Sequence, residues 1–472
     1  MSMTITFDNS YARLPGAFFT AQDPDPVRAP HLVAFNDDLA RLLRITPGDV
    51  QDMAQVFAGN RVPEGAEPLA QLYAGHQFGQ YNPQLGDGRA VLLGEVIGTD
   101  GIRRDIQLKG SGRTPYSRGG DGRAWLGPVL REYVVSEAMF VLGIPTTRAL
   151  AAVETGEQVV RETSLPGAVL TRVAASHLRV GSFQIFAARG DTASLKRLTD
   201  YAITRHYPEA DGPMGLLTAV RDAQARLIAA WMAVGFIHGV MNTDNCAISG
   251  ETIDYGPCAF LDSYHPDTVF SSIDRMGRYA YSNQPDIAVW NLAQLANALI
   301  QQTDDKQAGV DQATEIIHAM PDLIEQHWLA QFRAKLGLID THADDPALIR
   351  DLLTRMADNN ADFTNTFRAL GGKTARDQFT DPTAFDSWAA QWAQRTGSAL
   401  DLQARLHTAN PGIIPRNHRI EQMIDAAITG DYAPFHRLNT ALATPYTDHP
   451  QNQDLQRPPQ KDEVVQATFC GT

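Results

Sequence analysis

The order in which strand and helix patterns follow one another limits the fold of this chain more than any other feature. Between Gly86 and Ala175, short apolar runs and glycine-containing turns predict strands, with one helix among them. From about residue 190 to residue 440, apolar periodicity predicts mostly helices. A chain of 472 residues is too long for one ordinary core. We therefore expect an α+β protein in which a small β-rich lobe precedes a large helical lobe.

The β-rich part is expected to contain a hairpin, a helix and two further strands. Asp100-Gly101 is a typical hairpin turn between two runs rich in β-forming residues. Trp125 and Val129 lie on the apolar side of the helix, and Gly143 is a typical stop after its last turn. Before this part, the run "HLVAFNDDLARLLRI" predicts short helical pieces in an N-terminal extension. The expected strands cover residues 90–98, 102–110, 147–154 and 167–174, the helix covers 123–144, and a short hairpin is expected at 246–253.

Composition excludes several classes of protein. The formal charge of -14 and the isoelectric point near 5.3 argue against a nucleic-acid partner, because binding to a phosphate backbone needs clustered positive charge. Three cysteines are too few for a disulfide framework. The first residues do not follow the pattern of a targeting segment, so we expect none, and no apolar stretch of roughly 20 residues is present. We expect a cytoplasmic protein without a membrane partner.

The stretch "HGVMNTDN" resembles a phosphotransferase catalytic loop in which one residue is missing. In such loops a His, an Asp and an Asn follow at fixed spacing, and the Asp accepts the substrate proton while the Asn holds a metal. His238 and Asn245 keep this spacing, but Val240 occupies the Asp position. A carboxylate is present four positions later, at Asp244.

Three further residues follow the order found in kinases. Lys109 ends a predicted strand, and Glu132 lies at the edge of the apolar stripe of the predicted helix. A charged residue at that edge needs a partner, and a strand Lys paired with a helix Glu positions nucleotide phosphates in kinases. Asp254 opens "DYG", which corresponds to the metal-binding Asp-Phe-Gly of kinases with a Tyr in place of the Phe. A solvated strand end and a solvated helix residue are the alternatives for Lys109 and Glu132.

Two weaker signals each allow two interpretations. In "LGDGRAVLLGEV", Gly86 and Gly88 would let backbone N–H groups approach phosphates and Arg89 would add charge, although a plain hairpin turn explains the same letters. Arg172 and Arg179 lie seven residues apart in "TRVAASHLRVGSF". Two such arginines are either solvated surface charges or ligands of a phosphate group.

Several long runs resemble the selenoprotein O family, whose members are pseudokinase-like protein nucleotidyltransferases. The resemblance covers most of the chain from about residue 68 onward. It implies a kinase-like two-lobe fold that binds ATP in a reversed orientation and transfers AMP to protein hydroxyls with release of pyrophosphate. The matching runs are "LAQLYAGHQFGQY", "LGDGRAVLLGE", "LKGSGRTPYSRGGDGRA", "SEAMFVLGIPTTRAL", "HGVMNTDN", "DYGP" and the terminal "FCGT".

The resemblance also assigns roles to individual residues. Asp244 would be the proton acceptor, Asn245 and Asp254 would hold Mg²⁺ or Mn²⁺, and Glu132 would pair with Lys109. Turning the nucleotide end for end makes its terminal phosphates the leaving group, so positive charge is needed where they go. The nucleotide would be contacted by Gly86, Gly88, Arg89, Lys109, Asp121, Gly122, Arg172, Arg179 and Asp254.

Three functions compete at this stage. The first is a metal-dependent protein adenylyltransferase that uses ATP, with UTP as a second nucleotide, and modifies Ser, Thr or Tyr. The second is a kinase that transfers the γ-phosphate, and the third is an inactive nucleotide-binding scaffold. The expected parts are an N-terminal extension (1–70), a kinase-like N-lobe (71–180), a C-lobe with the catalytic and metal-binding loops (181–300), and a helical extension with a Cys-containing tail (301–472).

The tail residue Cys470 matches the position where members of the family carry a redox-active Cys or selenocysteine. Two alternatives remain for it. It is either a free thiol, or it forms a regulatory disulfide with Cys258 or Cys246.

Overall fold

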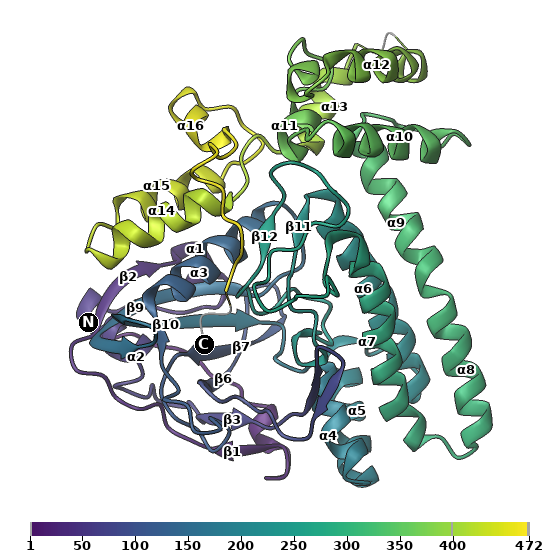
Figure 1. Cartoon of the computed structure of the whole chain (residues 1–472). Helices are drawn as coiled ribbons and strands as arrows, with labels where there is room; N and C mark the ends of the chain where they lie inside the picture. The colour runs from purple at the N-terminus through teal and green to yellow at the C-terminus, as the bar shows by residue number, and fades with distance from the viewer. Residues whose placement is uncertain (1, 398–399, 470–472) are drawn as a thin grey trace.

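A computed structural model describes residues 2–397 and 400–469 of the chain. One large antiparallel sheet and a series of helices form a mixed α+β structure, so the predicted α+β class is confirmed (Figure 1). The strands are β1 (Phe19–Ala21), β2 (His31–Phe35), β3 (Leu69–Gln71), β4 (Gly75–Gln77), β5 (Gln80–Asn82), β6 (Ala90–Ile97), β7 (Arg103–Lys109), β8 (Ala124–Trp125), β9 (Arg148–Val160), β10 (Ser164–Ala174), β11 (Phe236–Ile237) and β12 (Ala259–Phe260).

The helices dominate the second half of the chain. They are α1 (Asp37–Leu42), α2 (Val50–Phe57), α3 (Leu126–Val141), α4 (Val180–Ala188), α5 (Thr192–His206), α6 (Gly212–Ala233), α7 (Gln284–Leu299), α8 (Lys306–His318), α9 (Met320–Lys335), α10 (Asp345–Asp358), α11 (Phe363–Arg368), α12 (Pro382–Thr396), α13 (Leu402–Ala409), α14 (Asn417–Ile428), α15 (Ala433–Leu442) and α16 (Gln453–Gln456). None of the helices among the described residues is long and apolar enough to cross a bilayer.

The large sheet has the strand order β1-β3-β6-β7-β10-β9-β2, and β8 pairs with β10. The predicted hairpin β6–β7 is present as an antiparallel pair, and the two further predicted strands, β9 and β10, also pair antiparallel with each other. Helices α1 and α2 cover one face, where they share a core with Ile106 and Leu108 of β7. Helix α3 packs on β9 and β10, and its outer side is covered by α14 and α15 (Figure 1). The alternate residues of β7, Gln107 and Lys109, therefore lie on the face opposite α1 and α2.

Two local predictions were wrong. Residues 31–35 form strand β2, paired with β9, rather than part of a helix. The helix begins only after Asn36, whose side chain accepts a hydrogen bond from the N–H of Leu39 and so caps it. The hairpin expected at 246–253 is absent, because Ala247 pairs with Arg179 and Thr252 pairs with Thr146 instead of with each other.

The last described residues return to the middle of the molecule. The N–H of Thr468 donates to the carbonyl of Phe270 at 2.7 Å, and its carbonyl accepts from Ser272 at 3.0 Å. The Thr468 hydroxyl donates to the carbonyl of Pro257 at 2.5 Å. We call Phe270–Ser272 together with Thr468 the C-terminal strap. Phe270–Ser272 follows the "DYG" sequence in the chain. Cys470 lies outside the described residues, while Cys246 and Cys258 are buried free thiols.

Candidate active site

A cluster of opposite charges joins the sheet, helix α3 and the segment after the "HGVMNTDN" loop. Lys109 Nζ lies 2.6 Å from Glu132 Oε2 and also contacts Asp254 Oδ1. Arg172 Nη1 lies 2.8 Å from Asp254 Oδ1 and 3.3 Å from Glu132 Oε1. The four side chains come from β7, α3, β10 and the loop before Tyr255. The structure thus brings together two cations and two carboxylates that are far apart in the sequence.

Burial decides between the alternatives for these residues. The side chains of Lys109 and Glu132 are 13% and 5% exposed, and those of Arg172 and Arg179 are 3% and 2% exposed. The interpretation of these residues as solvated surface charges is therefore wrong. Burial alone would raise the pKa of Asp254, but Lys109, Arg172 and Arg179 together hold it well below its ordinary value. The Asp254 carboxylate therefore stays ionised at neutral pH and is paired with Lys109 and Arg172.

A second row of polar groups continues from Arg172 toward Arg179. Arg172 Nη2 donates to Gln107 Oε1 at 2.7 Å, and Gln107 Nε2 donates to Asp87 Oδ2 at 3.1 Å. Arg179 Nη2 lies 4.0 Å from Asp87 Oδ1, and its guanidinium stacks over the ring of Tyr73 at 4.3 Å. Burial raises the pKa of Asp87. This row fixes both arginines, and Arg179 Nη2 remains buried without a hydrogen-bond partner among the described residues.

Sequence reasoning missed Asp87 and Gln107 as members of the site. A signal for Gln107 was available, because it precedes Lys109 by two positions and a strand places such residues on one face. Asp87 lies between the two glycines of the predicted turn, where a polar residue looks like ordinary turn composition. Its complete burial could not be read from that pattern.

The predicted base, Asp244, lies in a short 3₁₀ helix (η2, Thr243–Asn245) beneath the β4–β5 hairpin. Gln77 Nε2 donates to Asp244 Oδ2 at 3.2 Å, while Asp244 Oδ1 is buried and has no partner among the described residues. A side chain at Gly75 would come within 3.0 Å of that oxygen. Arg179 Nη1 donates to the backbone carbonyl of Asp244 at 3.1 Å. Burial raises the pKa of Asp244 to about 6.

The loop is held in place by residues that do not touch the charged cluster. His238 is buried, and its Nε2 lies 2.9 Å from the carbonyl of Ile253, the residue before Asp254. Val240 is buried in the position where a kinase loop has its Asp. His238 thus holds the loop in place, and the apolar side chain of Val240 fills the position where a kinase has its catalytic Asp.

The predicted metal ligands Asn245 and Asp254 offer an amide oxygen and a carboxylate. Asn245 Nδ2 donates to the carbonyl of Val240 at 3.0 Å, which leaves its amide oxygen as the acceptor. The backbone of Asp254 has a φ of 65°, a left-handed conformation that only a few per cent of non-glycine residues adopt and that Asp adopts more readily than most. Oxygen donors of this kind fit Mg²⁺ or Mn²⁺. Among the described residues, no group of three or more His, Cys, Asp or Glu could hold a metal ion by itself, so phosphate oxygens would have to complete such a site.

The glycine-rich turn differs from the expectation in one respect. The N–H groups of Gly86 and Gly88 donate to the carbonyls of Tyr73 and Gly86, so they are used within the turn and are not open to a phosphate. A side chain at Gly86, whose φ is 70°, would lie 2.4 Å from the ring of Tyr116. The glycines are needed for close packing, and Arg89, which follows them, accepts the N–H of Gly110 with its carbonyl at 2.7 Å.

Asp121 and Gly122 lie in the loop that follows β7. Asp121 forms a two-pronged ion pair with Arg161, at 2.8 and 3.1 Å, which lowers the pKa of its carboxyl. A side chain at Gly122 would lie 2.0 Å from the carbonyl of Gly112. Within the described part of the chain, the polar contacts of Asp121 are with Arg161 and Arg123 rather than with the charged cluster.

Comparison with known proteins shows which class of protein contains this site. The family described as protein adenylyltransferase SelO matches residues 1–443. Proteins named protein nucleotidyltransferase YdiU are 75% identical over 472 residues in Ruegeria pomeroyi, 65% identical over 472 residues in Roseobacter denitrificans and 56% identical over 491 positions in Bradyrhizobium diazoefficiens, and each alignment covers the whole of both chains.

The charged cluster thus lies in an enzyme of the protein nucleotidyltransferase class, for which a nucleoside triphosphate is a substrate. Within this class, the chain belongs to the protein adenylyltransferase SelO family. The resemblance noted in the sequence is confirmed.

Proposed function

We propose that the chain transfers AMP from ATP to Ser, Thr or Tyr hydroxyls of proteins, with UTP as a second nucleotide, and that ATP binds in a reversed orientation in a kinase-like cleft. The acceptor oxygen attacks the α-phosphorus, the bond from the α-phosphorus to the bridging oxygen breaks, and pyrophosphate leaves. The observation that carries this proposal is Asp244, a buried carboxylate with one oxygen that has no partner among the described residues, in a loop whose usual acid position holds Val240.

Asp244 has the properties of a general base. With a pKa near 6 it is mostly ionised at neutral pH and still basic enough to take a proton from a hydroxyl group. Gln77 orients one carboxylate oxygen, which leaves the other for the acceptor hydroxyl. A base displaced along the loop suits an acceptor that meets the α-phosphate rather than the γ-phosphate.

The cations are proposed to bind the leaving group. Lys109, Arg172 and Arg179 lie in one connected network with Asp254 and Asp87. Positive charge fixed in a buried site stabilises a departing pyrophosphate without reorganisation during the reaction. We propose nucleotide contacts for Arg89, Asp121 and Gly122, as the family resemblance implies, and for Gly86 and Gly88 through atoms other than their N–H groups, which are bonded within the chain.

Asn245 and Asp254 are proposed to hold Mg²⁺ or Mn²⁺, which would neutralise phosphate charge when bound. The Lys109–Glu132 pair keeps the lysine directed at the same region. In the proposed two-lobe arrangement, residues 71–180 form the N-lobe and 181–300 the C-lobe, with extensions at 1–70 and 301–472. The low cysteine count supports a reducing cytoplasmic location.

Labelled nucleotide separates this proposal from its rivals. The protein is incubated with Mg²⁺ or Mn²⁺ and ATP labelled at the α- or the γ-phosphate, and protein-bound label is counted. Label from the α-position alone supports AMP transfer, label from the γ-position alone supports a kinase, and no label supports an inactive scaffold. Asp244→Ala should abolish transfer and leave nucleotide binding largely intact; undiminished transfer in this variant would remove Asp244 from the mechanism.

A further inference from the structure

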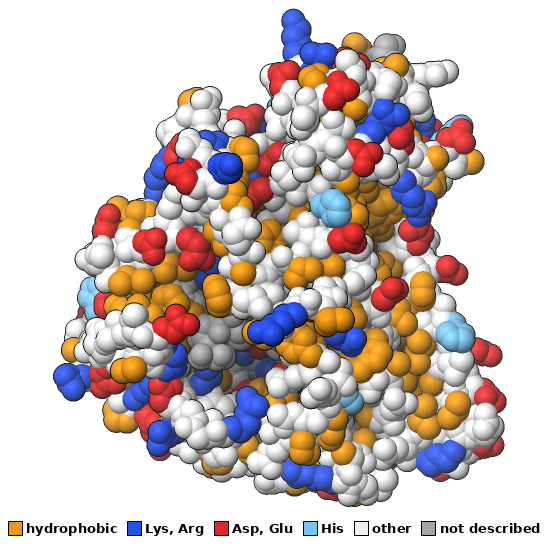
Figure 2. Space-filling view, in the orientation of Figure 1, with side chains coloured by type: hydrophobic (Ala, Val, Ile, Leu, Met, Phe, Trp, Pro, Cys, Tyr) orange, Lys and Arg blue, Asp and Glu red, His pale blue; other side chains and the backbone are white. Residues whose placement is uncertain are grey.

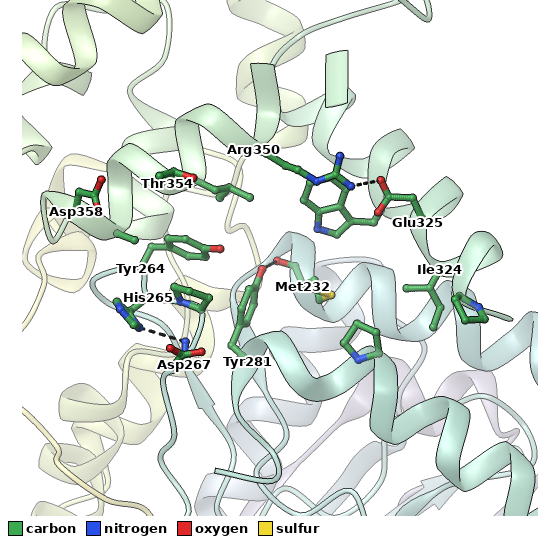
Figure 3. A pocket seen from close by; sticks show the side chains of 16 residues that line it. Met232, Tyr264, His265, Asp267, Tyr281, Ile324, Glu325, Arg350, Thr354 and Asp358 are labelled. Atoms are coloured by element: carbon green, nitrogen blue, oxygen red, sulfur yellow. Dashed lines mark hydrogen bonds and ion pairs between the residues drawn. The ribbon is translucent and has the colours of Figure 1, made fainter. Parts of the chain in front are cut away.

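An apolar cavity of about 620 Å³, whose lining contains no residue of the charged cluster, lies among α6, α9 and α10 (Figure 3). It is formed where α6, α9 and α10 meet the segment that runs from β12 to α7. In the space-filling view, hydrophobic side chains gather at the hollow below the upper helical part (Figure 2). The apolar walls include Met232, Tyr264, Tyr281, Ile324 and Trp328.

The cavity walls offer a ligand apolar surface rather than polar groups for recognition. The hydroxyl of Tyr281 donates to the carbonyl of Met232 at 2.7 Å, so it is already used within the chain. Trp328 lies beneath the guanidinium of Arg350 at 5.5 Å, and Arg350 in turn pairs with Glu325. A cavity of this size and lining accommodates one large apolar side chain together with its neighbours.

The edge of the cavity is acidic. Asp267 and Asp358 line it, both are exposed, and neither forms an ion pair among the described residues. The only cationic Lys or Arg side chain in the described lining, Arg350, is already paired with Glu325. An apolar group entering the cavity therefore passes two unpaired carboxylates, which favours an apolar residue with Lys or Arg beside it.

The same chain segment connects the cavity with the loop of the proposed base. The hydroxyl of Tyr279 donates to Asn242 Oδ1 at 2.7 Å, and the N–H of Phe78 donates to the same oxygen at 3.0 Å. Tyr281 in the cavity wall lies two residues after Tyr279, and Asp244 lies two residues after Asn242. This path limits the separation of Asp244 from the cavity to roughly 25 Å, which about eight extended residues can span.

We propose that this cavity is the docking site for an extended segment of the protein substrate, in which a large apolar residue next to Lys or Arg lies within about eight residues of the modified hydroxyl. The proposal rests on the proposed function, since it names the partner whose hydroxyl reaches Asp244. It also gives α9 and α10 a role in substrate selection.

Binding of synthetic peptides tests the proposal without nucleotide. The probes carry Arg-Arg-X, a six-residue Gly-Ser spacer and one Tyr, with X as Leu, Phe, Met or Trp, and matched peptides replace Arg-Arg by Glu-Glu or X by Ser. Labelled peptides are titrated with the full chain by fluorescence anisotropy. We expect at least one Arg-Arg-X probe to bind about tenfold more tightly than both of its matched peptides, and to weaken with added salt.

Variants then locate the binding surface. Asp267→Lys with Asp358→Lys reverses the charge of the edge, and Thr354→Trp places a ring at an exposed position in the lining. Each change is expected to weaken the best probe by about tenfold. The matched control is Asp304→Lys with Asp425→Lys, two exposed carboxylates outside the lining, and it should bind the probe like the unchanged chain.

Three results would overturn the proposal. The first is that no Arg-Arg-X probe binds better than its matched peptides. The second is that the cavity variants bind the best probe as tightly as the unchanged chain does. The third is a concentration-dependent dimer that the cavity variants abolish, which would assign the cavity to a second copy of the chain. Transfer of α-label to protein acceptors together with any of these results would leave the proposed function standing. Specific peptide binding without transfer would leave the docking site standing and count against the proposed function.

Discussion

Lys335 should destabilise the folded chain at neutral pH, and Lys335→Met should therefore stabilise it. The side chain lies at the end of α9 and is 4% exposed. Burial lowers the pKa of Lys335 from its ordinary value of 10.5 to about 7. Its Nζ lies over the faces of Phe363 and Phe367, 5.3 and 4.3 Å from the ring centres.

The magnitude follows from the shift in pKa. A shift from 10.5 to about 7, at about 1.4 kcal/mol for each unit, lowers the free energy of unfolding by about 5 kcal/mol when the lysine is charged in both states. The two ring contacts offset part of this cost, at about 1 kcal/mol each. We therefore expect Lys335→Met to raise the free energy of unfolding by about 2–3 kcal/mol at pH 7.

The sign of the pH dependence is fixed by the direction of the shift. Between pH 7 and pH 10.5 the unfolded chain binds a proton at Lys335 that the folded chain does not, so the stability of the unchanged protein rises with pH in this window. The variant lacks this contribution. Its advantage should therefore be full below pH 7 and disappear toward pH 10.5.

Urea unfolding followed by tryptophan fluorescence suits this measurement. Trp328, Trp388 and Trp392 belong to the same core cluster as both phenylalanine rings, and they are three of the six tryptophans in the chain. Lys373→Met is the control, because Lys373 is exposed. A variant that is less stable than the unchanged protein at pH 7, or a difference that does not vary with pH, would refute the reasoning.

Three further predictions concern the site. Glu132→Gln should lower the rate of transfer by about 100-fold without preventing folding, because Lys109 loses one of the two carboxylates that hold it in place; a normal rate in the label assay would remove this pair from the mechanism. Gly122→Ala should reduce the melting temperature far more than Gly119→Ala, because both residues have positive φ but only Gly122 lacks space for a side chain, and equal losses would contradict this account. Asn245→Ala should shift the Mg²⁺ activation curve to at least about tenfold higher concentration, whereas an unshifted curve would exclude Asn245 as a ligand.

The part of the fold with strong local signals could be predicted from the sequence. The β6–β7 hairpin follows from Asp100-Gly101, and α3 ends at Val141, before the predicted stop at Gly143. Strand β2 was missed, because a short apolar run next to a helix has the same letters whether it packs as a strand or as a helix. Its pairing with β9 depends on residues more than a hundred positions away.

The candidate site likewise contains residues that could be predicted from the sequence and residues that could not. The order of Lys109, Glu132, Asn245 and Asp254 could be found in the sequence, because each residue belongs to a short pattern with known spacing. The role of Asp87 could not, since its burial depends on the packing of Gln107 and Arg179 from two other elements. The cavity near α9 and α10 is formed by residues from several distant segments and leaves no local pattern.

The C-terminal strap ties the last residues of the chain to the segment that follows Asp254. During synthesis, the segment from Pro257 to Ser272 leaves the ribosome long before Thr468 does. Its hydrogen bonds to Thr468 can form only after residue 468 has been synthesised. Assembly of this side of the candidate site therefore waits for Thr468. A nascent chain that has not reached this residue lacks these hydrogen bonds, and truncation before Thr468 removes them.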